Sequence, residues 1–145
     1  FLGELILDQD LEYDNYFDED LCGTCMACIE ACPTQALDEY KIDAGKCISY
    51  LTIEHRGSFA DDQEDLYGWI YGCDVCQEVC PWNQKFSMVT NREEFQSHQE
   101  ILQFENVDWD ELDEEGFRKL FKGSAVKRTK YSGLKRNIEQ KSRPK

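Results

Sequence analysis

The spacing of the cysteines constrains this chain more than any other feature of its sequence. The stretch LCGTCMACIEACP has the spacing C-x2-C-x2-C-x3-C-P, a run that ligates iron–sulfur clusters. A second stretch, GCDVCQEVCPWN, ends in the same Cys-Pro pair but supplies three cysteines where four are needed. The one cysteine outside both stretches is Cys47, and 25 residues lie between it and Cys73. Cys47 is therefore the candidate for the missing ligand.

The run also predicts how the cysteines are shared between two clusters. In two-cluster proteins the cysteine that precedes the proline ligates the other cluster. Crossing the ligands in this way uses all eight cysteines and leaves residues 55–63 outside ligation. The predicted ligands are Cys22, Cys25, Cys28 and Cys80 for the first [4Fe–4S] cluster and Cys32, Cys47, Cys73 and Cys76 for the second.

Zinc and disulfides are the alternative uses of these cysteines. Zinc sites usually show paired C-x2-C units without a third cysteine two residues on and a following proline. Disulfide frameworks belong to secreted chains. The opening FLGELIL is interrupted by Glu4 and has no basic leader, so it does not read as a signal peptide. The pattern favours iron–sulfur ligation.

Composition indicates a soluble chain, which we expect in the cytoplasm. The 145 residues have a mean hydropathy of −0.66 and 32% of them are charged. No apolar run approaches the roughly 20 residues of a membrane helix. Since the first residue is Phe and not Met, we expect a processed or truncated chain.

Charge is distributed very unevenly. Residues 1–117 carry 29 acidic and 5 basic side chains, whereas residues 118–145 carry 11 basic side chains and one acidic residue, Glu139. A basic tail on an acidic body suits contact with a polyanion such as RNA phosphate. Pairing of the tail with the acidic body explains the same pattern. Charge alone leaves both readings open.

The order of apolar and turn residues predicts three parts. Residues 1–20 read as a lead-in strand (GELIL) and an acidic connector, residues 21–90 as a two-cluster domain, and residues 91–145 as a helical segment with a basic C-terminal tail. The fold class predicted is α+β: a two-[4Fe–4S] bacterial ferredoxin-like module with a basic helical C-terminal extension. A pair of adjacent clusters serves to move single electrons.

Several local elements follow from the pattern. We expect a short helix over residues 26–31, a hairpin over 35–43, and a helix through CISYLTIE that Asp43 caps. From about residue 92 we expect an amphipathic segment that buries Phe95, Ile101, Leu102 and Phe104. A second helix should begin near Asp113 and stop at Gly123. Its apolar face should consist of Leu112, Phe117, Leu120 and Phe121. Ser124 should cap a third helix that runs to about Asn137.

Other candidate residues suit ordinary structural roles. His55 and His98 have no partner motif, and Trp69, Tyr71 and Trp82 read as core aromatics that also shield a cluster. No Gly-rich phosphate loop, nucleophile elbow or Ser/His/Asp set is present. The sequence therefore predicts no self-contained catalytic centre.

Four stretches together, CGTCMACIEACPTQAL, KCISYLTIEHRG, IYGCDVCQEVCPWN and FKGSAVKRTKYSGLKRN, resemble the C-terminal half of epoxyqueuosine reductases. The resemblance spans nearly the whole chain. It implies a tRNA-modifying oxidoreductase in which two clusters deliver electrons from an external low-potential donor to cobalamin, which reduces epoxyqueuosine at the tRNA wobble position to queuosine. The cobalamin-binding N-terminal domain of that family has no counterpart in this sequence, so we expect no turnover from this chain by itself.

The resemblance also implies site residues. It places Thr52, Glu54, Cys73 and Asp74 on the cobalamin side, and it favours phosphate contact by the basic tail, with candidates Lys127, Arg128, Lys130, Lys135 and Arg136. Three other readings stay open: a stand-alone two-cluster ferredoxin that carries electrons, the ferredoxin module of a cobalamin-dependent reductive dehalogenase, and a zinc-stabilised RNA-binding module.

Overall fold

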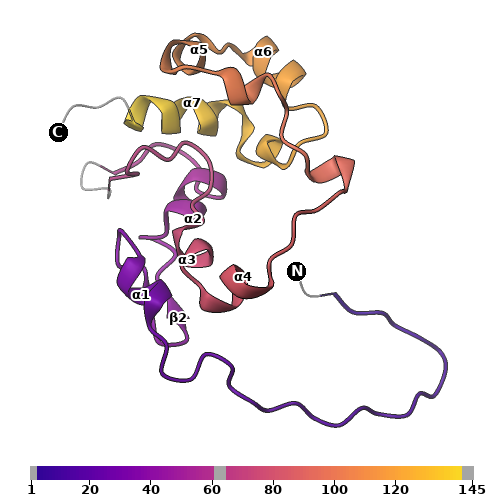
Figure 1. The fold of residues 1–145 in the computed structure, drawn as a ribbon. Helices are drawn as coiled ribbons and strands as arrows, with labels where there is room; N and C mark the ends of the chain where they lie inside the picture. The colour runs from indigo at the N-terminus through magenta and orange to yellow at the C-terminus, as the bar shows by residue number, and fades with distance from the viewer. Residues whose placement is uncertain (1–2, 61–64, 142–145) are drawn as a thin grey trace.

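The computed structural model describes residues 3–60 and 65–141, which form short helices and one small sheet (Figure 1). The iron–sulfur half is built from elements of two to six residues, and the longest helix is the last. The α-helices are α1 (Ala27–Ala31), α2 (Ile48–Ile53), α3 (Val75–Glu78), α4 (Pro81–Phe86), α5 (Asn106–Glu111), α6 (Glu114–Leu120) and α7 (Lys130–Lys141). The strands are β1 (Leu37–Asp38) and β2 (Lys41–Ile42), and the 3-10 helices are η1 (Glu93–Phe95), η2 (Ile101–Gln103) and η3 (Ala125–Thr129).

The predicted hairpin is present as the sheet of the described residues. β1 and β2 pair antiparallel, with Leu37 opposite Ile42 and Asp38 opposite Lys41. Tyr40, in the turn between them, has a positive φ of 56°. The hairpin lies next to α1, at the opposite end of the molecule from α5 and α6 (Figure 1). The mixed helix and strand content predicted for this half is confirmed.

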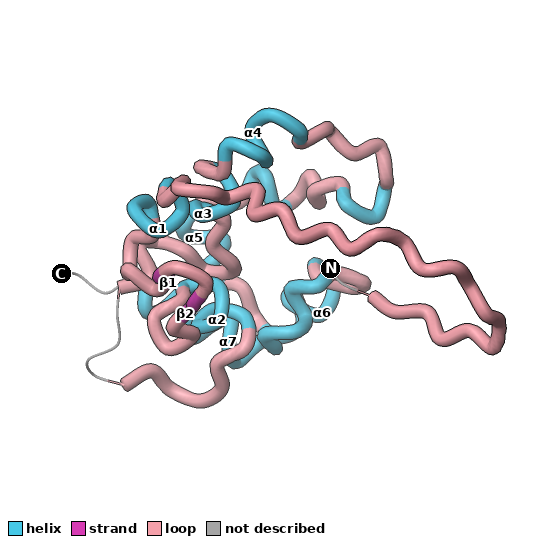
Figure 2. The backbone as a smooth tube through the Cα atoms, turned by 90° about the horizontal axis from the view of Figure 1, so that it is seen from below, coloured by secondary structure: helices cyan, strands magenta, loops and turns pink. Residues whose placement is uncertain are grey.

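The strand predicted over GELIL is wrong. Residues 3–20 form an exposed arm without helix or strand, which runs away from the helices (Figure 2). Residues 1–2 of the predicted lead-in lie outside the described residues. A strand needs a neighbour to receive its ladder hydrogen bonds, and the arm has none within the described chain. The short apolar run was therefore insufficient to predict a strand here.

Two apolar clusters hold the fold together. The larger one joins α6 to α7 through Phe117, Leu120, Phe121, Leu134 and Ile138, all at most 8% exposed. The smaller one packs α2 against the segment that follows the insertion, through Ile48, Leu51 and Leu66. α7 lies across α2 and so connects the two halves (Figure 1).

The C-terminal helices were predicted in part. Asp113 caps α6, accepting a hydrogen bond from the Gly116 N–H at 2.7 Å, and Gly123 follows the helix with a φ of 79°. Ser124 also caps as expected, with its Oγ 3.2 Å from the Val126 nitrogen, but the helix it begins is η3. A positive φ of 63° at Lys130 separates η3 from α7. The third helix is thus broken in two.

Two other local predictions are wrong. Phe95 and Leu102 are 76% and 65% exposed, because residues 92–104 form two isolated 3-10 turns that bury only part of the expected face. Asp43 does not cap α2, since its carboxylate accepts from the Gly45 N–H at 2.9 Å in a turn. The N-cap residue of α2 is Cys47 itself.

Among the helices of the described residues, none has the length and apolar character that crossing a membrane requires.

Candidate iron–sulfur site and the polar network beside it

The two cysteine runs fold alike. The residue before α1, Met26, has φ −118° and ψ 10°, and the residue before α3, Asp74, has φ −112° and ψ 11°. The two helices pack against each other. The cysteines that leave each unit also match, with φ and ψ of −65° and 114° at Cys32 and −66° and 119° at Cys80. The internal repeat seen in the sequence is thus a repeat of backbone geometry.

The structure brings together the four cysteines predicted for the second cluster. Cys32 from the first run lines the same cavity of about 40 Å³ as Cys47, Cys73 and Cys76. Burial raises the pKa of Cys73, and the thiols of Cys76, Cys47 and Cys32 contribute to the shift against an opposing backbone N–H of Val75. The four cysteines that the crossing rule groups together therefore line one cavity.

Backbone groups prepare Cys32 to carry negative charge. Its Sγ accepts a hydrogen bond from the Ala36 N–H at 3.3 Å and lies 3.8 Å from the Thr34 hydroxyl. Burial would raise the pKa of Cys32, but the N–H groups of Ala36, Thr34 and Leu37 and the Thr34 hydroxyl lower it overall. Hydrogen bonds to the sulfurs are one of the factors that set the reduction potential of an iron–sulfur cluster.

The first ligand set is more open. Cys22, Cys25 and Cys28 line a cavity of about 650 Å³ at the protein surface. Cys80, the fourth predicted ligand, follows α3 and is partly buried, but it does not line this cavity. Leu37 and Ile42 line both this cavity and the smaller one, so the hairpin separates two neighbouring thiol-lined sites.

The number and type of donors at these sites suit clusters of several atoms. Within residues 3–60 and 65–141, no three His, Cys, Asp or Glu side chains converge closely enough to hold a single metal ion. The cysteines are instead distributed around cavities. A [4Fe–4S] cluster takes four cysteine thiolates, one at each iron, whereas zinc draws its four ligands to one point. Two sets of four cysteines supply the thiolates that two such clusters require.

A polar network begins directly behind the second site. Thr52 is completely buried in α2, and its hydroxyl donates to the Ile48 carbonyl at 2.7 Å and accepts from the Gly72 N–H at 3.0 Å. Gly72 has a φ of 73°, which favours glycine, and it immediately precedes Cys73. Thr52 therefore connects the helix that follows Cys47 to the backbone that presents Cys73.

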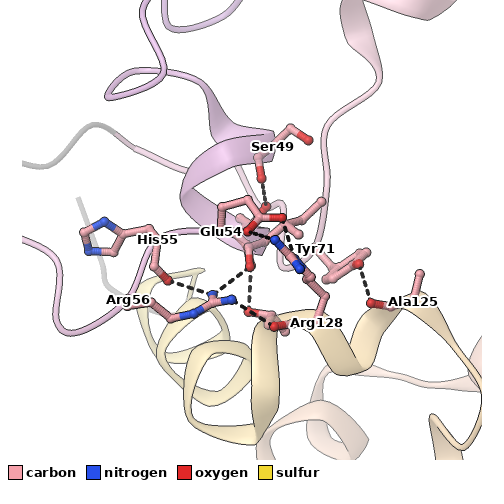
Figure 3. Close-up of polar contacts among 10 residues, drawn as sticks. Ser49, Glu54, His55, Arg56, Tyr71, Ala125 and Arg128 are labelled. Carbon is pink, nitrogen blue, oxygen red and sulfur yellow. Dashed lines mark hydrogen bonds and ion pairs between the residues drawn. The ribbon is translucent and has the colours of Figure 1, made fainter. Parts of the chain in front are cut away.

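Glu54, the C-cap residue of α2, faces Arg128 (Figure 3). Its two carboxylate oxygens accept from the Arg128 Nε and Nη2 at 2.8 and 2.9 Å. The hydrogen bond from Arg128 lowers the pKa of Glu54, and burial opposes that shift. Arg56 donates to the Arg128 carbonyl at 3.1 Å, and the Tyr71 hydroxyl donates to the Ala125 carbonyl at 2.9 Å. These contacts fasten η3 to the iron–sulfur half.

The five basic residues predicted for phosphate contact do not share one environment. Arg128 pairs with Glu54, Lys135 donates to the Asp110 carbonyl at 2.6 Å, and Arg136 is partly buried among carbonyls. Lys127 and Lys130 are exposed, and no hydrogen bond or ion pair of either ammonium group occurs within the described part of the chain.

Of the four residues predicted on the cobalamin side, Thr52 is buried, Glu54 is paired, Cys73 lines the smaller cavity and Asp74 is exposed.

Sequence reasoning missed Asn137 and Thr129. Both are buried, and both donate to the Thr52 carbonyl, at 2.8 and 2.9 Å. Each is a polar residue inside a basic, predominantly hydrophilic stretch. Nothing in a single sequence separates such a residue from its solvated neighbours, because the acceptor lies more than 70 residues away along the chain.

The 4Fe-4S double cluster binding domain family matches residues 21–83, which contain all eight cysteines. An epoxyqueuosine reductase of Cellulophaga algicola is 50% identical over 141 residues, or 96% of this chain. This chain is a homologue of the epoxyqueuosine reductases. It spans 45% of the length of that relative. The recognition made from the four sequence stretches is thus confirmed.

Solved structures of epoxyqueuosine reductases share the fold. A selenomethionine-labelled one superimposes with a TM-score of 0.76 at 29% identity, covering 88% of this chain and 34% of the other. Another was crystallised with an epoxyqueuosine-modified tRNA-Tyr stem loop and superimposes with a TM-score of 0.66 at 27% identity, covering 88% of this chain and 34% of the other. The likeness extends beyond residues 21–83 into the C-terminal helices.

Proposed function

We propose that this chain carries two [4Fe–4S] clusters and acts as the electron-transfer part of a cobalamin-dependent epoxyqueuosine reductase. The observation that supports this best is the crossing of Cys32 from the first run into the cavity lined by Cys47, Cys73 and Cys76. Crossed ligation is the arrangement of two-cluster proteins. The remaining set, Cys22, Cys25, Cys28 and Cys80, would hold the other cluster.

The arrangement suits stepwise electron transfer. The two cavities share Leu37 and Ile42 as lining residues, so clusters in them would be neighbours. Each cluster passes one electron at a time. Removing an epoxide oxygen as water takes two electrons and two protons, so the pair would relay electrons from an external low-potential donor toward the substrate. The first site is the more open and suits entry from that donor.

Cobalamin would lie against one side of this chain. When bound, cobalamin supplies the metal centre that reduces the substrate. Asp74 is exposed and lines a surface cavity of about 590 Å³ with Gln77, Glu78, Asn83, Gln84 and Ser87. The polar groups of these side chains offer hydrogen-bond partners to the amide side chains of cobalamin. Asp74 is therefore the strongest of the four candidates. Thr52 would contribute by holding Gly72 in place, since its hydroxyl is buried and already bonded.

The tRNA contact would use the exposed lysines of the basic tail. We expect the double variant Lys127→Ala, Lys130→Ala to bind an epoxyqueuosine-modified anticodon stem loop more weakly than the cluster-loaded parent chain. The slope of log affinity against log salt should fall by about 2, since each phosphate-contacting lysine contributes about 1. Fluorescence anisotropy over a salt series measures both quantities. The control is Lys85→Ala, which changes an exposed lysine in α4 and should keep the salt slope of the parent. An unchanged salt slope in the double variant would argue against tRNA contact by the tail.

The cluster content tests the proposed function. Chain purified without oxygen and loaded with iron and sulfide should contain about eight irons and eight acid-labile sulfides. It should be coloured, whereas zinc thiolate sites do not absorb visible light. Zinc without sulfide would contradict the proposal. Eight irons in a full-length relative that binds neither cobalamin nor tRNA would favour a plain ferredoxin, and cobalamin binding without tRNA binding would favour the dehalogenase reading.

A further inference from the structure

The guanidinium of Arg136 has no donor left for a ligand. A guanidinium has five N–H groups. Nε and Nη2 donate to the Asn137 side-chain oxygen at 3.1 and 2.8 Å. Nη2 also donates to the Leu51 carbonyl at 2.9 Å, and Nη1 donates to the carbonyls of His55 and Gly57 at 3.1 and 2.9 Å. The guanidinium carbon lies 4.1 Å from the centre of the Phe59 ring. Phosphate contact would require breaking this arrangement.

Asn137 completes the same unit. Its side chain is fully buried, and its amide nitrogen donates to the carbonyls of Thr52 and Ile70 at 2.8 and 2.9 Å. Its oxygen accepts the two bonds from Arg136. Both donors and the acceptor are therefore satisfied, so neither side of this amide can be removed without leaving a buried polar group unpaired.

The acceptors of these bonds lie in the two segments that carry second-site cysteines. Leu51 and Thr52 belong to α2, whose N-cap residue is Cys47. Ile70 comes three residues before Cys73. The Thr52 hydroxyl accepts a hydrogen bond from the N–H of Gly72, two residues after Ile70. One amide on α7 thus fixes the distance between the end of α2 and the approach to Cys73.

We infer that Arg136 and Asn137 are positioning residues for the second iron–sulfur site, acting from α7 and outside the domain matched at residues 21–83. The inference rests on the cluster binding proposed above. The pair touches no cysteine in the described structure and acts through the backbone of α2 and of residues 70–73. The basic tail then has two roles: Arg136 supports the cluster site, and the exposed Lys127 and Lys130 remain available to a polyanion.

The test compares the release of the two clusters in Arg136→Lys and Asn137→Ser. Lysine keeps the charge but cannot bridge four acceptors, and serine is too short to span the two carbonyls. Cluster-loaded chain is mixed with an iron chelator without oxygen, and loss of each cluster is followed by absorbance and by EPR of reduced samples. We expect the second cluster to be lost about 10-fold faster than in the parent, the size typical of a lost supporting contact. The first cluster should leave at the parent rate.

The EPR signal identifies which cluster has left. Two reduced clusters side by side give an interacting signal, and a single remaining cluster gives an isolated one. Comparison of that isolated signal with those of Cys22→Ser and Cys47→Ser, each of which should keep one cluster, shows which cluster remains. Lys135→Met is the matched control, because Lys135 neighbours Arg136 on α7 but donates to the Asp110 carbonyl, away from both cysteine segments. This variant should match the parent.

The outcomes separate this inference from the proposed function. Parent-like release from both variants would overturn the inference while leaving the proposal intact. Equal acceleration for both clusters, or the same acceleration in Lys135→Met, would also overturn it, because general weakening of α7 would then explain the result. A parent chain that never reaches about eight irons would count against the proposed function itself.

Discussion

Cys47→Ser should halve the iron content, from about eight to about four irons per chain. Cys47 lines the smaller cavity with Cys32, Cys73 and Cys76, and it reaches that cavity as the N-cap residue of α2. A serine hydroxyl keeps its proton at neutral pH and is a poor ligand for iron in a sulfur-bound cluster. With three thiolates left, the second cluster should not survive purification. Iron and sulfide analysis of anaerobically loaded protein measures the loss.

The complementary variant gives this prediction its control. Cys22→Ser changes a cysteine in the larger cavity and should remove the first cluster while the second remains. Both variants should therefore hold about four irons, but the residual EPR signals should differ because the remaining clusters have different surroundings. A Cys47→Ser protein with about eight irons would show that Cys47 is not a ligand. The incomplete second run would then need another source for its fourth ligand.

Gly133→Ala should destabilise the chain, although alanine is the better helix former. Glycine in a helix interior usually costs about 1 kcal/mol relative to alanine. Here the new Cβ would lie 2.5 Å from the Thr129 Oγ1, a distance that real Cβ atoms essentially never show. That hydroxyl is buried and donates to the Thr52 carbonyl at 2.9 Å, so it cannot move freely. Overpacking of this kind costs about 1–3 kcal/mol and should exceed the propensity gain.

Thermal unfolding of the cluster-loaded chain measures the effect, at roughly 4 °C of midpoint per kcal/mol. The control is the same glycine substitution in a Thr129→Ala background. Removing Oγ1 leaves the Thr129 Cβ as the nearest atom, at 3.6 Å, which is an ordinary contact. Gly133→Ala should then be neutral or stabilising, so the sign of its effect should reverse between the two backgrounds. The same sign in both would show that the close approach to Thr129 is not the cause.

Much of the iron–sulfur half could be predicted because its information is local. Ligand spacing of two and three residues specifies a loop and a short helix, and the crossing rule assigns Cys32 to the other set without any knowledge of the fold. Helix caps are local in the same way, since Asp113 and Ser124 bond to N–H groups two or three residues away. The sequence by itself determined these caps and the family, and it predicts the two cysteine sets.

Only the tertiary structure decided what the basic tail does. The basic residues of the tail are alike as charges in the sequence. In the structure Arg128 pairs with Glu54, Arg136 donates hydrogen bonds to backbone carbonyls, and Lys127 is exposed. The difference comes from partners more than 70 residues away from Arg128 and Arg136. The last carbonyls of α2 lack partners within the helix, and a cation on α7 can satisfy them. Which cation does so depends on how α7 packs across α2, and that packing is a property of the folded chain.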